Sequence, residues 1–460
     1  MRRAAVLALG LVLAGCVAPT ASDVPQRREI ARDPGLALPS MKRFGAAPAS
    51  APRRSNASIA ADFLELSFRM ESGREIPRLT RFEGPVRVSV TGQVPATAAA
   101  DLADLVRRLR SEAGIDISVV PAGGPVEITV EFMPRSRMQA AVPHAACFVV
   151  PRVSGWDEFR AARLTPKVDW TTLTVRERVS VFVPSDVAPQ EIRDCLHEEI
   201  AQALGPLNDL YHLSDSVFND DNFHNVLTGF DMLILRATYA PELRSGMTRA
   251  EVAAVLPGVL ARLNPGGQGA GGAVAGPTPR AWTVAIETAL GPRTAAAERR
   301  AAAQRALQIA EAHGWQDNRR AFSHFALARL SLASEVESAV RHFAEAARIW
   351  RGLPEGAVHL AHVDMQMAAF ALSSGQYAEA LAMTDRAIPA VQRAQNAALL
   401  STLMLIRAEA LDGLGRTADA RAVRMDSLGW ARYGFGADGQ VHSRMREIAA
   451  LGPARVASRN

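Results

Sequence analysis

Apolar and polar positions change their periodicity several times in the first half of the chain. Apolar residues spaced three and four apart predict amphipathic helices at 58–70 and 102–114, whereas alternation at 86–90 predicts a half-buried strand. Short apolar runs predict further strands, at 115–120, 126–132, 147–150 and 179–183. A helix is expected directly after the last of them, capped by Ser185 or Asp186. This order of elements predicts an α+β domain with a mixed sheet.

The region from 280 to 460 has a helical spacing of apolar residues almost throughout, is rich in alanine, and contains repeats. Three similar segments recur at spacings of 41 and 40 residues, namely Ser334–Ala339, Gly375–Ala380 and Gly415–Ala420. A small residue stands seven positions after each segment, at Ala346, Ala387 and Ser427. Gly-x-Tyr-x-x-Ala resembles the tetratricopeptide repeat, although the period exceeds the usual one of about 34 residues. The alternative is a plain helical bundle; either arrangement stacks helices and offers a surface for partners.

The first residues have the features of an export signal. A basic start precedes an apolar run at 4–13, which is too short to span a bilayer as a mature helix. Leu13-Ala14-Gly15-Cys16 resembles the lipobox of bacterial lipoproteins, in which the cysteine is acylated and becomes the first mature residue. This resemblance implies a signal peptide at 1–15 and a lipid on Cys16. The alternative is an ordinary signal peptide with an incidental cysteine.

The export signal and two stretches of low complexity divide the rest of the chain. Because Val17 and not aspartate follows the cysteine, the lipobox resemblance favours the outer membrane, facing the periplasm. Residues 16–57 are rich in Pro, Ala, Ser and Arg and predict a flexible tether, and 263–279 predicts a linker. An α+β domain is therefore expected at 58–262 and a helical repeat domain at 280–460. The expected partners are the membrane, through the lipid, and an envelope protein, through the repeats.

Charge and cysteine content narrow these expectations. The formal net charge is +5, but lysine occurs only at positions 42 and 167 and the arginines are interleaved with acids. This pattern excludes a continuous basic surface of the kind that binds nucleic acid. Besides Cys16 the chain has Cys147 and Cys195. In an oxidising compartment a disulfide between them is expected, and two inert buried thiols are the alternative.

The candidate chemistry lies between 191 and 239. Taken from His197, the sequence fails as a zinc-protease motif, because the residue four positions later is Ala201. Shifted by one residue, Glu198-Glu199-x-x-Gln202-x-x-Gly205-x-x-Asn208 has the spacing of the metzincin motif His-Glu-x-x-His-x-x-Gly-x-x-His. The resemblance places Glu199 as the general base. It places Glu198, Gln202 and either Asn208 or Asp209 at the metal-ligand positions.

Two downstream segments extend this resemblance. Ser216–Asn219 stands where metzincins have a methionine-bearing turn, with Phe218 in place of the methionine, and Leu227–Tyr239 resembles their closing helix, with Thr228 and Asp231 forming a near capping box. The same stretch, roughly 60–262, also resembles an uncharacterised family of bacterial lipoproteins, catalogued as a domain of unknown function and grouped with the zincin-like folds. This implies a zincin-like domain with a degenerate active-site helix and supplies no activity.

The donor atoms of the motif decide what it can bind. Zinc is held by imidazole and thiolate, or by one carboxylate with two histidines, whereas the shifted motif offers oxygen donors only. We therefore expect no standard zinc site and no other cofactor. Acids of the nearby turn leave a calcium site or a two-carboxylate glycosidase open, although turn chemistry explains most such clusters; these acids are Asp209, Asp215, Asp220 and Asp221. Arg236 is a possible partner for Glu199, and His212 and His224 are expected to be solvated.

Two functional hypotheses follow. The first is a binding or scaffold lipoprotein with a catalytically silent zincin-like domain, and the missing histidines and the appended repeats favour it. The second is an atypical, peptidase-like hydrolase that uses Glu199 as its general base.

Overall fold

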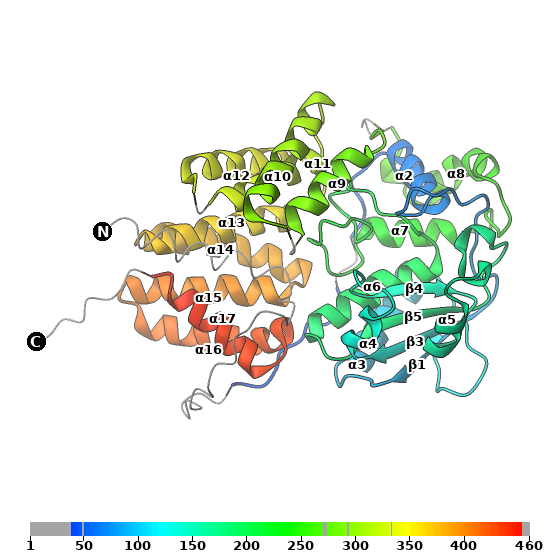
Figure 1. The fold of residues 1–460 in the computed structure, drawn as a ribbon, viewed down its shortest axis with the longest axis horizontal. Coiled ribbons are helices and arrows are strands. Elements are labelled where there is room, and N and C mark those ends of the chain that lie inside the picture. The colour runs from blue at the N-terminus through cyan, green and yellow to red at the C-terminus, as the bar shows by residue number, and fades with distance from the viewer. Residues whose placement is uncertain (1–37, 48–49, 270–273, 292–293, 333, 453–460) are drawn as a thin grey trace, which may run out of the picture. The chain divides into compact units, whose positions relative to one another are not determined.

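The computed structural model describes residues 38–47, 50–269, 274–291, 294–332 and 334–452 (Figure 1). They belong to two compact units: one runs from Phe44 to Thr278, and the other combines the residues before Phe44 with those from Pro279 onward. The predicted signal peptide and Cys16 lie outside the described residues. Within these described ranges, no helix is long and apolar enough to cross a membrane.

A five-stranded mixed sheet, in the order β2-β1-β3-β5-β4, forms the centre of the α+β unit (Figure 1). Its strands are β1 (Val86–Gly92), β2 (Ile117–Val119), β3 (Ile128–Met133), β4 (Phe148–Pro151) and β5 (Val179–Pro184). β4 pairs antiparallel with β5, whereas the other pairs are parallel. All residues of β5 are buried, as expected for a strand covered on both faces. The α+β class and the mixed sheet predicted from the periodicity are confirmed.

Helices supply the apolar layers of this unit. They are α2 (Asn56–Phe68), α3 (Ala98–Glu112), α4 (Arg135–Gln139), α5 (Trp156–Ala162), α6 (Pro189–Leu204), α7 (Gly229–Thr238) and α8 (Arg249–Leu263). Leu105 of α3 and Leu196 of α6 are buried with Val130 and Val181 of the sheet in one core. α6 packs against β5 and β4, so the sheet holds the candidate motif in place.

Two predicted helix starts are wrong. α6 begins at Pro189, with Ala188 as its N-cap, because the N–H of Ser185 extends the sheet by donating to Met133 O and the Asp186 carboxylate accepts from Arg135 N–H. Proline suits this first helical position since its missing N–H would have no helical partner. α2 starts earlier than expected, at Asn56, where the Ser55 side chain accepts from Ser58 N–H.

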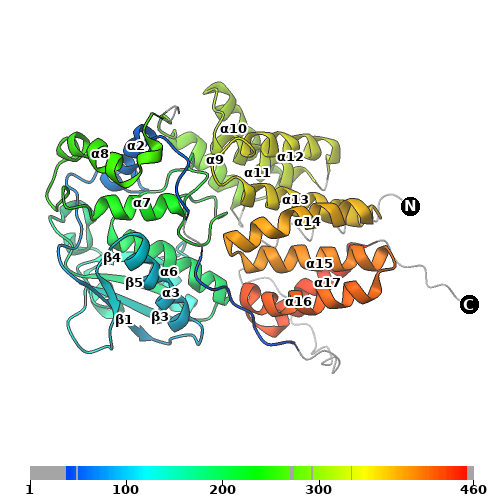
Figure 2. The same ribbon diagram turned by 180° about the vertical axis from the view of Figure 1, so that it is seen from behind.

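The helical unit consists of successive helices joined by short turns (Figure 2). They are α9 (Arg280–Leu290), α10 (Ala296–Ala312), α11 (Asn318–Ser331), α12 (Val336–Trp350), α13 (Ala357–Ser373), α14 (Tyr377–Ala394), α15 (Ala397–Gly413), α16 (Thr417–Phe435) and α17 (Asp438–Ala449). The three repeated segments open α12, α14 and α16, as predicted. Their small residues are all buried, namely Ala339, Ala346, Ala380, Ala387, Ala420 and Ser427. Small side chains at these positions allow the helices to approach closely.

A histidine pair joins two helices of this unit. His324 of α11 and His342 of α12 face each other with 2.9 Å between their Nδ1 atoms, and His324 is only 5% exposed. Burial, with a smaller contribution from the neighbouring His342, lowers the pKa of His324 to about 4. His324 is therefore protonated at a lower pH in the folded protein than in the unfolded chain, where its pKa is about 6.5.

This pair predicts a loss of stability in mild acid. Because the folded-state pKa of His324 lies below the unfolded value, its stabilisation is present above about pH 6.5 and is lost as the pH falls towards 4, by up to roughly 3 kcal/mol. Urea unfolding followed by circular dichroism between pH 7 and 4 measures this loss. We expect a His324→Asn variant to flatten the pH dependence; equal slopes for the variant and the wild-type chain would contradict the assignment.

Candidate functional site

The second half of α6 presents the shifted motif on one side of the helix. Glu198 and Gln202 are four residues apart and therefore share a face. Gln202 is 6% exposed, and its Nε2 donates to Glu71 Oε1 at 3.5 Å. Glu71 lies just beyond α2, so it reaches the motif from a segment more than a hundred residues earlier in the chain. Sequence reasoning did not find Glu71, because no motif connects it to α6.

A buried arginine caps the end of this helix. Arg176 donates through Nη1 to the carbonyl oxygens of Gln202, at 2.5 Å, and Ala203, at 2.6 Å, and through Nη2 to that of Gly205. Its guanidinium lies 4.9 Å from the centre of the Trp170 ring. Burial lowers its pKa to about 10. These contacts satisfy carbonyls that the helix itself leaves without partners.

Gly205 ends the helix, as the motif predicts, for reasons of space. Its φ of −167° is open to any residue. A Cβ atom at this position would, however, lie 3.2 Å from Thr238 Cγ2 of α7. The glycine therefore lets the end of α6 approach α7 closely.

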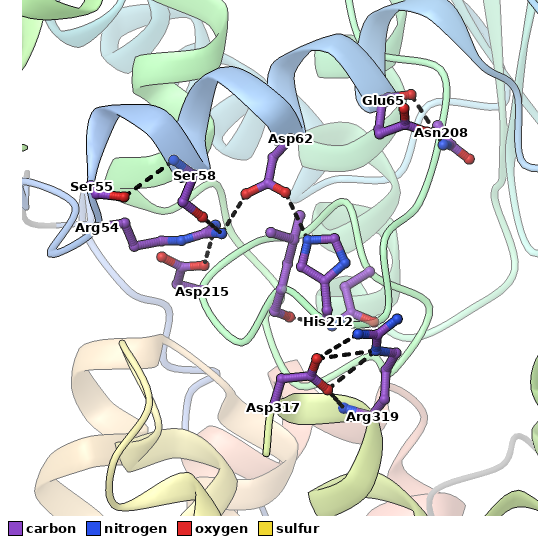
Figure 3. A network of polar contacts seen from close by, with 12 residues as sticks. Arg54, Ser55, Ser58, Asp62, Glu65, Asn208, His212, Asp215, Asp317 and Arg319 are labelled. Carbon is purple, nitrogen blue, oxygen red and sulfur yellow. Dashed lines mark hydrogen bonds and ion pairs between the residues drawn. The ribbon is translucent and has the colours of Figure 1, made fainter. Parts of the chain in front are cut away.

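Asn208 and Asp209, the two residues considered for the third ligand position, have different surroundings. Asn208 Nδ2 donates to the carbonyl oxygen of Glu65 in α2 at 3.1 Å, so its amide is directed to the backbone of that helix (Figure 3). Asp209 has both carboxylate oxygens closed off from solvent, and the charges of Asp220, Glu71 and Glu198 act on it. Asp209 is thus the one of the two that the loop brings to Glu198.

Five acids form what we call the acidic cluster: Glu71, Glu198, Glu199, Asp209 and Asp220. Burial, followed by the charges of Asp220 and Glu71, raises the pKa of Glu198 to about 8. Burial and the charge of Glu198 raise the pKa of Glu199 well above its usual range. Glu199 is 4% exposed, and its Oε2 has no hydrogen-bond partner among the described residues. Arg236, which we considered as its partner, donates instead to Glu112 O at 2.7 Å.

A small polar cavity of about 40 Å³ adjoins Glu198. The residues that line it are Asp194, Glu198, Val217, Asn219, Asp220, Asn222, His224 and Asn225. Asn225 Nδ2 donates to Asp194 Oδ2 at 2.8 Å. The Oδ1 atoms of Asp194 and Asn225 are buried and receive no hydrogen bond from the part of the chain that is described. The cavity wall is therefore dominated by oxygen acceptors.

The turn and closing helix downstream of the motif are tied together by one buried acid. Asp231 Oδ1 accepts from Ser216 Oγ at 2.5 Å, and its Oδ2 accepts from Val217 N–H at 3.2 Å. Thr228 and Asp231 form the capping box that starts α7, as the sequence predicted. Phe218 is fully buried in the core. The turn is thus fixed next to the cavity.

The loop histidines were expected to be solvated, but the side chain of His212 is buried and His224 is partly buried. The side chain of His212 is 8% exposed, and its Nε2 lies 2.7 Å from Asp62 Oδ1. Asp62 also pairs with Arg54, whose Nη1 lies 3.4 Å from Asp215 Oδ1 (Figure 3). His224 lines the cavity and bonds to Ser214 O at 3.0 Å. Arg54 belongs to the stretch predicted as a tether, and it attaches the described end of that stretch to this unit.

The predicted disulfide between Cys147 and Cys195 is confirmed, with 5.9 Å between the Cα atoms. It links α6 to the residue before β4. The bridge also removes Cys195 as a thiolate ligand. His197, the only imidazole of α6, is 2% exposed, and its Nδ1 accepts from Leu227 N–H at 3.2 Å.

The donor set does not fit zinc. Every side chain at the ligand positions of the shifted motif offers oxygen, whereas protein zinc sites rely on imidazole or thiolate. Across the described ranges, no three His, Cys, Asp or Glu side chains are already arranged to hold a metal ion.

Comparison with known proteins shows that part of the chain is similar to a protein family of unknown function. Residues 56–258 match it. Its description reads "Protein of unknown function (DUF2927)", and the match covers the α+β unit from α2 into α8. No curated protein and no solved structure matches the chain.

Proposed function

We propose that this protein is a lipid-anchored binding or scaffold protein of the bacterial envelope. In this proposal a zincin-like domain without zinc chemistry and a set of tetratricopeptide-like repeats are held at the outer membrane through Cys16. The observation that carries it is the oxygen-only donor set at the ligand positions of α6. A site without imidazole or thiolate lowers the pKa of a bound water far less than zinc does, and so makes a weak nucleophile.

Several features support the zincin-like part of the proposal. The motif helix α6 directly follows β5 and lies next to β4, which is the one antiparallel strand in the described sheet. A buried turn and a closing helix follow the motif in the order that the metzincin resemblance implies. In this proposal the repeats provide the binding surface. Their helices stack side by side and pack against one another through buried small residues.

The second candidate function is hydrolysis with Glu199 as the general base. The burial of Glu199 beside Gln202 in the motif frame favours this candidate. The raised pKa of Glu199 argues against it, since a carboxyl that holds its proton more tightly is less available in the ionised form that a general base requires. We therefore prefer the binding role.

Peptide-cleavage assays on the full mature chain test the preference. We expect no cleavage of a peptide library, with or without added zinc, and no difference between the wild-type chain and Glu199→Gln. Cleavage that Glu199→Gln abolishes would overturn the proposal in favour of the hydrolase.

Membrane fractionation tests the anchor separately. The wild-type chain is expected to sediment with outer membranes and to incorporate labelled fatty acid, whereas Cys16→Ser should be released as soluble protein. A Cys16→Ser chain that stays with the membrane to the same extent would refute lipid anchoring at this residue.

A further inference from the structure

The stretch predicted as a tether is docked on the helical unit where its description begins (Figure 2). Residues 38–43 form neither helix nor strand and belong to this unit. Lys42 N–H donates to Gly429 O of α16 at 2.9 Å, and the Lys42 ammonium pairs with Asp426, 384 residues further along the chain. The same ammonium lies 5.6 Å from the centre of the Trp430 ring. An irregular segment from the start of the chain therefore lies against a helix near its end.

Contacts before Lys42 extend the docking along the same helix. Leu38 packs against a small apolar cluster of α16 and α17, and the Pro39 carbonyl oxygen accepts from Arg432 Nη1 at 2.9 Å. The buried members of this cluster are Leu428, Ala431 and Val441. A leucine and a lysine four residues apart thus provide an apolar and a charged anchor, and backbone groups between them bond to α16.

Gly429 allows the segment to come this close to α16. A Cβ atom at its position would lie 3.0 Å from Lys42 Cγ and 3.2 Å from Ser40 O. Glycine inside a helix lowers stability relative to alanine, so its presence here indicates a gain elsewhere. The equivalent positions of the two earlier repeats, 81 and 40 residues before it, hold Arg348 and Pro389. The glycine that admits the segment is therefore specific to the last of the three repeats.

The contacts of residues 38–43 are those of a bound peptide that can be exchanged. The Lys42 and Asp426 side chains are 44% and 45% exposed, and ion pairs this exposed contribute little to stability. Met41, in the middle of the segment, is 40% exposed. Peptides are commonly recognised through main-chain hydrogen bonds together with a few side-chain anchors, which is the pattern seen on α16.

We propose that α16 carries a binding site for a peptide segment with a leucine and a lysine four residues apart, and that residues 38–43 occupy this site in cis. A partner segment of the same pattern must displace them, and their attachment to the chain gives them the advantage of a high effective concentration. The inference rests on the binding role proposed for the repeats and deepens it, because it names the surface and the chemistry of the partner.

Proteolysis of the full mature chain in detergent tests the docking. The only lysines of the chain are Lys42 and Lys167, so a lysine-specific protease cuts after these two residues alone. Gly429→Leu fills the place of the segment with a side chain that suits a helix, and should speed cleavage after Lys42 at least about tenfold, because cleavage requires local opening. Cleavage after Lys167, in the α+β unit, should keep its rate. Arg348→Leu, at the equivalent position of the first repeat, is the matched control and should change neither rate; equal cleavage after Lys42 in Gly429→Leu and the wild-type chain would overturn the docking.

Peptide binding tests the exchange. The probe is a fluorescein-labelled peptide of residues 38–45, and the site is opened in the full chain by Leu38→Asp with Lys42→Glu, whose circular dichroism should match that of the wild-type chain. Fluorescence anisotropy should show the peptide binding to the opened chain at least about tenfold more tightly than to the wild-type chain, in which the site is filled. No binding to the opened chain, or equal affinity for both chains, would refute the site.

A further variant identifies the charged anchor. Asp426→Asn in the opened chain should weaken peptide binding several-fold, whereas Asp419→Asn should leave it unchanged. Asp419 is the matched control because it lies on the same helix, is 56% exposed and pairs with Arg416 instead. Equal peptide affinity of the two variants would contradict the role of Asp426. Glu199 and Cys16 do not enter these assays, so the inference and the proposed function can fail separately.

Discussion

Replacing both cysteines of the disulfide, in a Cys147→Ala/Cys195→Ala chain, is expected to lower the free energy of unfolding of the α+β unit by about 4 kcal/mol. The bridge spans 48 residues and restricts the unfolded chain, and its loss restores that conformational entropy. It also holds α6 against β4, because it joins Cys195, a residue of α6 that is 3% exposed, to Cys147 directly before β4. Urea unfolding of the two proteins under oxidising conditions measures the difference.

Reduction of the wild-type chain provides the control for this prediction. With dithiothreitol present, the wild-type chain should unfold close to the double variant, since both then lack the crosslink. If the oxidised wild-type chain and the double variant unfold at the same urea concentration, the disulfide does not contribute to stability in the way proposed.

Replacing Arg176 with methionine is expected to cost a similar amount, roughly 3–5 kcal/mol. The substitution keeps an apolar chain of comparable length but removes the charged hydrogen bonds to the carbonyls of Gln202, Ala203 and Gly205. These oxygens would stay buried at the end of α6 without donors. Thermal and urea unfolding of the variant measure the loss.

Arg178, two residues along the chain, is the matched control. Its side chain is 44% exposed, and its contacts lie at the surface, so Arg178→Met should change stability by less than about 0.5 kcal/mol. An Arg176→Met chain as stable as the Arg178→Met chain would show that solvent or a neighbouring group replaces the cap.

The sequence predicted the arrangement of the residues of the shifted motif only in part. The helical spacing put Glu198 and Gln202 on one face, and the glycine marked the end of the helix. The frame could not choose between Asn208 and Asp209, because the direction of a side chain beyond a helix end depends on the path of the loop. The contact of Asn208 with Glu65 O, far away in the sequence, made that choice.

The sequence by itself determined the order and class of the elements, the start of each repeated helix pair, and the two cysteines that could pair. These follow from local periodicity and from the small set of residues that can form a crosslink. Only the tertiary structure decided which groups surround the motif: Glu71 beside Gln202, Arg176 at the end of α6, and Asp62 with His212. Each of these contacts joins segments separated by at least 26 residues. No spacing rule connects such residues, because their distance is set by how the sheet and helices pack.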